Sequence, residues 1–168
     1  NYNVAVGDEA GTALTTGDNN TFVGYAAGDA QTTASNNTAV GAVAATTLTT
    51  GASNTAIGYY SLNAATTGAN NVAVGVGSLG ALTTASGNIG VGYDAGRQVT
   101  TGAENTFVGY QAGDATTTGA NNTTLGISSL GGNTTGAGNT AIGRLALYSN
   151  TTAADNTAVG NSCLQNNT

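Results

Sequence analysis

The chain has 168 residues, of which 6% are charged, and its formal net charge is −6. Average proteins carry about 25% charged residues. Here Arg97 and Arg144 are the only basic side chains, so the basic surface that nucleic-acid binding requires is missing. Histidine, the commonest general base and metal ligand, is absent, and no run of about 18 apolar residues predicts a transmembrane segment.

A phrase of the type N-T-A-V-G recurs every 17 residues, without insertion, along the whole chain. The consensus unit is N-T-A-V-G-Y-x-A-L-x-x-x-T-T-G-A-x, and we number its positions from the Asn. Position 1 is always Asn: Asn3, Asn20, Asn37, Asn54, Asn71, Asn88, Asn105, Asn122, Asn139 and Asn156. Position 5 is always Gly: Gly7, Gly24, Gly41, Gly58, Gly75, Gly92, Gly109, Gly126, Gly143 and Gly160. A strict short period is typical of a solenoid, so residues 1–168 are predicted to form a single repeat array.

Each unit begins with a strand signal. Positions 2–6, for example Thr38 to Ala42, alternate and are rich in β-branched residues, as strands are. A second, shorter strand is expected near positions 8–9 or 12–14. The end of the unit is predicted to be a turn with positive φ, because position 15 is usually Gly: Gly17, Gly51, Gly68, Gly102, Gly119 and Gly136.

One unit is therefore predicted to be one coil of an all-β fold, a parallel β-solenoid (β-roll) with ten 17-residue coils and no caps. Coils stacked at the strand spacing would form a rod about 48 Å long. Equivalent side chains then lie above one another, and a stacked Asn hydrogen-bonds to its copies and to the turn backbone. We therefore expect the Asn and Gly rows to be structural ladders.

The alternation also predicts which side chains are buried. Position 4 is Val, Ile or Leu in every unit, so we expect this row to form the core and Val74→Asp to be strongly destabilising. The opposite face carries mostly Ala at position 3 and Gly at position 5, and so flat a face lets another backbone approach. Because one Val and a few Ala make a thin core, we expect this face to meet another chain, in a trimer. Phe22 and Phe107, at position 3, either face solvent or fill a local widening.

Two units are more alike than the rest. Residues 20–36 and 105–121, five units apart, share F-V-G-Y-x-A-G-D-A. Position 9 is Gly in units one, two, six and seven, Ala in unit three and Leu in the rest. We interpret this likeness as a duplication within the array.

The units resemble the repeats of bacterial surface proteins and phage tail-fibre proteins, as in residues 54–70, with N-T-A-I-G-Y followed by T-T-G. The phrases V-A-V-G and T-A-I-G are also similar to the head repeats of trimeric autotransporter adhesins. The resemblance covers the whole chain, although the unit here is longer than in adhesin heads. It implies a β-roll in which three chains pack together, in an extracellular fibre that displays or binds. It implies no catalytic residue, because the adhesin heads have no catalytic site.

The remaining chemistry is sparse. The eight carboxylates scatter over several unit positions, so they form no ladder of the kind that binds calcium in other solenoids. Cys163 is single and stands where other units have Ala or Ser, which is typical of a small buried residue. We therefore predict no enzyme activity, no catalytic residue, no cofactor and no metal site.

Three further features remain open as functional candidates. N-x-S/T sequons, possible glycan sites, begin at Asn19, Asn36, Asn121, Asn122, Asn133, Asn150 and Asn166, although such strings also arise by chance in an Asn/Thr-rich repeat. Tyr25, Tyr59, Tyr93 and Tyr110 share position 6 and either stack within the rod or bind sugar rings. The Thr pair at positions 13–14 suggests ice binding, but only one hydroxyl of each adjacent pair should face outwards, and no outward T-x-T is expected.

The sequence thus favours a structural or adhesive fibre segment, located outside the cell, on a cell surface or on a virion surface. Its expected partners are copies of itself, in a trimer or an end-to-end fibre, and surface glycans, with no nucleic acid and no membrane insertion. Ice binding and glycan binding are the alternatives. Because both ends cut through a unit and terminal coils expose strand edges, we expect a longer array or ends that stack on another copy.

Overall fold

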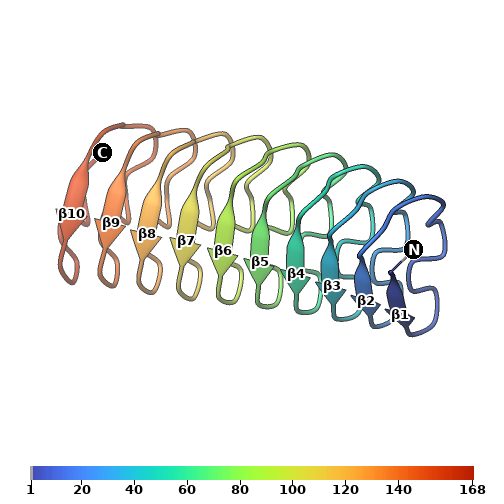
Figure 1. The fold of residues 1–168 in the computed structure, drawn as a ribbon. Coiled ribbons are helices and arrows are strands. Elements are labelled where there is room, and N and C mark those ends of the chain that lie inside the picture. The colour runs from blue at the N-terminus through green and yellow to red at the C-terminus, as the bar shows by residue number, and fades with distance from the viewer. Residues whose placement is uncertain (1) are drawn as a thin grey trace.

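In the computed structural model, which describes residues 2–168, the chain is a parallel β-solenoid without a helix in the described residues. Each unit contributes one strand: β1 (Val4–Val6), β2 (Thr21–Val23), β3 (Thr38–Val40), β4 (Thr55–Ile57), β5 (Val72–Val74), β6 (Ile89–Val91), β7 (Thr106–Val108), β8 (Thr123–Leu125), β9 (Thr140–Ile142) and β10 (Thr157–Val159). The strands form one parallel sheet in chain order, and the two ends of the chain lie at opposite ends of the rod (Figure 1). The predicted fold class is confirmed.

Each strand is shorter than predicted, because Gly at position 5 ends it. These glycines have φ between 124° and 142°, which a side chain rarely adopts. A Cβ at Gly24, moreover, would lie 2.6 Å from the carbonyl oxygen of Gly41 in the next coil. The Gly row therefore turns the chain and lets successive backbones stack closely.

The expected second strand is absent from the described coils. Positions 7, 9 and 17 have positive φ in every described coil, even where the residue is Leu62 or Leu79, so the chain turns repeatedly instead of extending. Backbone hydrogen bonds still join neighbouring coils there, as from Gly28 N–H to the carbonyl of Ala44 at 3.0 Å. Gly at position 15 does not have positive φ, so that prediction is wrong; the left-handed residue of this turn is at position 17.

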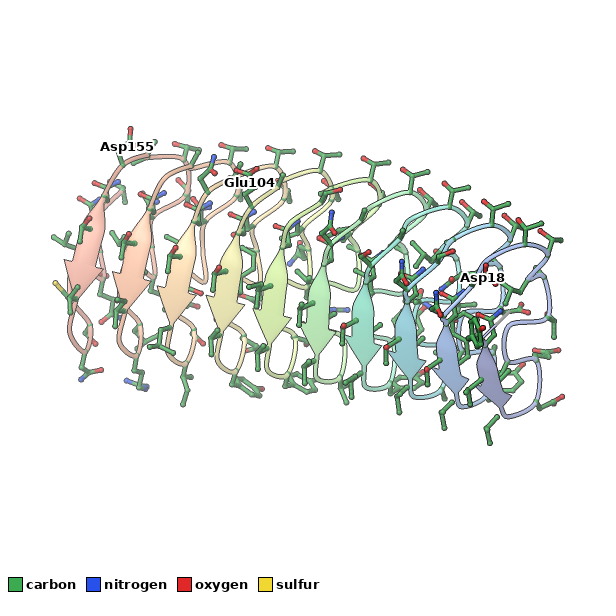
Figure 2. All side chains as sticks on the ribbon, in the orientation of Figure 1. Asp18, Glu104 and Asp155 are labelled. Carbon is green, nitrogen blue, oxygen red and sulfur yellow. The ribbon has the colours of Figure 1, made fainter. Side chains whose placement is uncertain are left out.

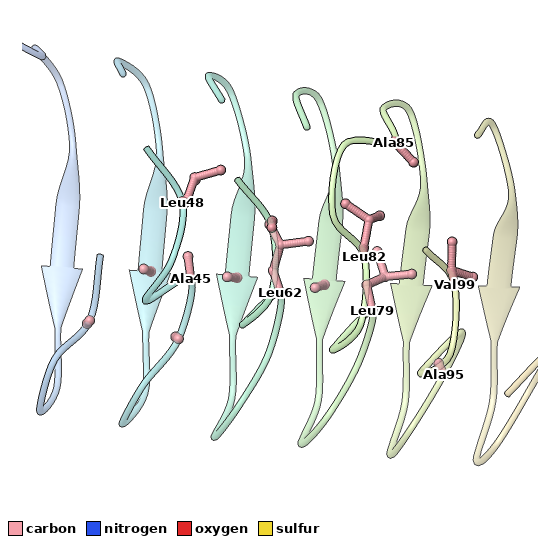
Figure 3. Close-up of a cluster of buried hydrophobic side chains, with 14 of the residues drawn as sticks. Ala45, Leu48, Leu62, Leu79, Leu82, Ala85, Ala95 and Val99 are labelled. Atoms are coloured by element: carbon pink, nitrogen blue, oxygen red, sulfur yellow. The ribbon is translucent and has the colours of Figure 1, made fainter. Parts of the chain in front are cut away.

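The predicted faces of the strand are reversed. Position 3 is buried from β2 to β10, whereas the position 4 row is partly or largely exposed, with Ile57 at 40% and Val159 at 64%. The apolar volume of the core comes from positions 9 and 12, where Leu48, Leu62, Leu79 and Leu82 are fully buried. Figure 3 shows these side chains gathered between the strands and the returning segments. A small residue is needed at position 3 because these leucines occupy the space in front of it.

Phe22 and Phe107 lie inside the rod and are fully buried. Each ring fills space that position 9 leaves empty: a Cβ at Gly28 would lie 2.6 Å from the Phe22 ring, and a Cβ at Gly96 would lie 2.6 Å from the Phe107 ring. Phe at position 3 thus replaces Leu at position 9. This exchange of volume gives a packing reason for the likeness between residues 20–36 and 105–121.

The reversed faces make a direct prediction. Ala73→Asp places a charge in the closed interior and should cost several kcal/mol. Val74→Asp, one residue further on the outer face, should cost about 1 kcal/mol, the size of a strand-preference effect. Thermal unfolding followed by circular dichroism compares the two variants, and equal losses would contradict the assignment of faces.

The exchange of Phe for Leu can be tested with a double-mutant cycle. Phe107→Ala leaves a cavity and should cost about 3–5 kcal/mol, while Gly113→Leu alone should clash with the Phe107 ring and also destabilise. The double variant recreates the Ala/Leu arrangement of other coils, so it should recover much of the loss. Losses that simply add in denaturant unfolding would show that the two positions do not share space.

Candidate functional site

The Asn row at position 1 joins the coils and also closes each one. The backbone N–H of Asn37 donates to Oδ1 of Asn20 at 2.9 Å, and the same type of bond links every successive pair from Asn3 to Asn156. In eight coils the Asn Nδ2 donates to the position 15 carbonyl of its own coil, as from Asn37 to Gly51 at 2.9 Å. The amides from Asn20 to Asn139 are at most 1% exposed. This row therefore serves the fold and presents nothing to a ligand.

The seven predicted glycan sites fall into two groups. Asn19, Asn36 and Asn121, at position 17, and Asn166 are exposed. Position 17 lies in the turn before each strand. Glu104 and Asp155, which are labelled in Figure 2, occupy this position in two other coils.

The other three, Asn122, Asn133 and Asn150, are fully buried. Their Nδ2 atoms donate to backbone carbonyls, those of Asn122 and Asn133 to Gly136 at 3.0 Å and that of Asn150 to Ala153 at 3.0 Å. The folded coil has no room for a glycan on these three, so the prediction is wrong for them.

As predicted, only one Thr of each pair at positions 13 and 14 is exposed from coil two to coil eight. At position 13 the Oγ1 donates to the same position's carbonyl in the next coil, as from Thr49 to Thr66 at 3.0 Å, in eight successive coils. The Thr at position 14 is exposed in all nine coils that have one. Position 13 thus forms a second ladder, and position 14 forms a polar row open to solvent.

The outer side of the sheet is a second surface, which sequence reasoning assigned to the core. It carries Thr at position 2 in seven coils and Val, Ile or Leu at position 4 in all ten. Each row is in register from strand to strand, as Thr38 pairs with Thr55 and Val40 with Ile57. We call these two rows the Thr/Val face. Next to it lies the position 6 row, where Tyr25, Tyr59, Tyr93 and Tyr110 are each about half exposed.

In residues 2–168 no group of three or more metal-ligating side chains comes together. The hydroxyl of Thr12 donates to Asp29. A hydrogen bond from Tyr25 to Glu9 raises the pKa of Tyr25. Burial raises the pKa of Asp114, and the nearby charge of Asp94 adds to this effect.

Aromatic and charged side chains meet on coils four to seven. Tyr59 and Tyr60 are in ring contact, with centroids 5.5 Å apart, and Tyr93 stacks on Tyr110 at 5.2 Å. Between them is a hollow of about 320 Å³, which Asp94 and Arg97 also line. Sequence reasoning selected three of these tyrosines but missed the hollow, whose signal is the Gly at position 7 of coil five.

No family model matches the chain, and no curated protein or solved structure is similar enough to count as a match. Of the described residues, none belongs to a helix long and apolar enough to span a membrane.

Proposed function

We propose that the chain is a segment of an extracellular structural or adhesive fibre, a stiff shaft that associates laterally with copies of itself. The observation that carries this proposal is the unbroken register: nine strand pairings in succession each advance by 17 residues. Every surface row therefore runs the length of the rod. The extracellular location is supported by the resemblance to surface and tail-fibre repeats.

The Thr/Val face is the surface for association. The expected Ala/Gly face is not available, because the position 3 alanines from Ala39 to Ala158 are inside the coil. Val6, Ile57, Leu125 and Val159 are each at least 40% exposed on the Thr/Val face. Ten strands about 4.8 Å apart, each about 10 Å long, give a face of roughly 480 Å². The position 4 side chains make about half of this face apolar, and a contiguous apolar patch of a few hundred Å² on a monomer often marks an interaction site.

A second copy fits this face better than a charged partner. Neither row contains a charged residue, so nothing on the face would pair with a partner's charges. Because the rows repeat at the coil spacing, a copy with the same spacing can place side chain against side chain along the whole rod. The patch by itself is smaller than the roughly 800 Å² per partner of a standard interface, so association through this face depends on the sum of many weak contacts along the rod.

Lysine substitutions on the Thr/Val face test this proposal. Val40→Lys/Val74→Lys/Val108→Lys places three charges on coils three, five and seven, and should convert the oligomer into a monomer because a charge buried at an interface is costly. Thr50→Lys/Thr84→Lys/Thr118→Lys places the same charges on the same coils, but at position 14, and should leave the oligomer intact. Sedimentation velocity measures both variants, and circular dichroism shows whether they are folded. A wild-type chain that is monomeric at every concentration would contradict lateral association.

Ice binding remains a second candidate, and the Thr/Val face is the observation that favours it. Seven coils present an outward Thr-x-Val, Thr-x-Ile or Thr-x-Leu motif on one flat sheet, and the methyl groups and hydroxyls on such a face can order water. This candidate predicts that a monomeric wild-type chain lowers the freezing point below the melting point when ice is present. The position 4 lysine variant should lose this effect, and the position 14 variant should keep it. A wild-type chain without the effect would eliminate the candidate.

A further inference from the structure

Coil five differs from its neighbours by two missing side chains. Position 7 is Gly77 and position 10 is Gly80, and no other unit has Gly at both positions. The flanking coils have Tyr60 and Asp94 at position 7, and Arg97 at position 10 of coil six. A hollow lies beside Gly77, and it is lined by Tyr59, Tyr60, Val76, Gly77, Tyr93, Asp94 and Arg97.

A second hollow, of about 380 Å³, continues the first one. It is lined by Tyr60, Gly77, Gly80, Ala81, Arg97 and Gln98, so three residues are shared between the two. Together they form a groove across the rod, which we call the coil-five groove. Pockets of about 300–1,000 Å³ are typical of sites for small molecules.

The walls of the coil-five groove are aromatic. Tyr59 and Tyr60 belong to coil four and Tyr93 to coil six, so their backbones are two coil steps apart, about 9.5 Å. Val76 stands at position 6 of coil five, between Tyr59 and Tyr93, and also lines the hollow. The tyrosine rings and the Val76 methyl groups together offer an apolar surface that suits the C–H groups of a saturated ring. The contact between Tyr93 and Tyr110 supports its wall from outside the groove.

The floor of the groove offers both an acceptor and donors. The Asp94 carboxylate lies in the space that a Cβ at Gly77 would occupy, and its Oδ1 is 3.7 Å from Nε of Arg97. The Asp94 side chain is 13% exposed and that of Arg97 is 62% exposed. Both residues line the hollow, so the largely exposed Arg97 presents donors to the hydroxyls of a ligand and Asp94 presents an acceptor.

The charges argue against an anionic ligand. Asp94 and Arg97 cancel each other, and the chain as a whole carries a net charge of −6. Asp114 follows Arg97 in the same row, one coil further along. A phosphate or sulfate would therefore meet more repulsion than attraction.

We propose that the coil-five groove binds a neutral pyranose residue of a glycan, with the C–H face of the sugar ring against the tyrosines and its hydroxyls on Asp94 and Arg97. The adjoining hollow is large enough for the next sugar of the chain. The inference deepens the adhesive part of the proposed function and rests on it, but the groove is separate from the Thr/Val face.

The test is saturation-transfer NMR on the whole chain, with the methyl glycosides of neutral hexoses and N-acetylhexosamines as probes. Gly77→Gln fills the groove and displaces the Asp94 carboxylate from the space beside Gly77, and its backbone conformation is suitable because Gln111 has φ 51° at the same position in coil seven. Tyr93→Ala removes a wall, whereas Tyr25→Ala removes a position 6 tyrosine outside the groove and is the matched control. We expect at least one neutral glycoside to bind the wild type, about tenfold or more weaker binding in the two groove variants, and unchanged binding in the control.

Circular dichroism identifies any variant that does not fold. If either Gly77→Gln or Tyr93→Ala does not fold, the other variant still tests the groove. The inference is overturned if no neutral glycoside binds the wild type, if Gly77→Gln binds as well as the wild type, or if only sialylated or sulfated probes bind. Sedimentation separates this failure from failure of the fibre proposal. The groove variants should associate like the wild type, and the position 4 lysine variant should still bind sugar.

Discussion

The two hydrogen bonds of the position 1 Asn are the constraint on which the rest of the structure depends. Its Oδ1 accepts from a backbone 17 residues ahead, and its Nδ2 donates to a carbonyl 14 residues ahead. An insertion in either part of the coil would break one of these bonds, and a buried polar group without a partner costs about 1–3 kcal/mol. The strict 17-residue period follows, because each coil must return its backbone to the same place.

Because the backbone is the same in every coil, a larger side chain at one interior position requires a smaller side chain at another. Phe22 and Phe107 at position 3 accompany Gly at position 9 of their own coil and of the preceding coil, and wherever position 9 is Leu, position 3 is Ala or Thr. Position 12 changes from Leu82 and Val99 to the polar Thr116, Asn133 and Asn150, all fully buried. Asn133 and Asn150 donate to position 15 carbonyls, as the position 1 Asn does. The apolar core is accordingly divided into two clusters, with Phe107 in the first and Leu130 in the second.

The 17-residue period, the parallel sheet and the structural roles of the Asn and Thr rows could be predicted from the sequence, because each depends on residues that recur at a constant interval. The faces of the strand could not. A three-residue strand such as Thr38–Val40 has too few alternations to distinguish a core face from an outer face, and Val is acceptable on both. The core leucines at position 9, such as Leu62 and Leu79, have a left-handed backbone, where Leu is uncommon. The signal that was available is the pairing of Phe22 and Phe107 with Gly at position 9, which places position 3 inside.

The surface divides into rows that are uniform and rows that vary, and this division separates the two proposed roles. Position 4 is aliphatic in every coil and position 13 is always Thr, so each contact that one coil makes there is repeated by the others. Positions 6, 7 and 10 vary between aromatic, charged, small and amide residues, so a contact there is confined to one or two coils. A uniform row suits association, where many weak contacts add along the rod. A local site needs a departure from the repeat, and in coil five the departure consists of two side chains that are missing.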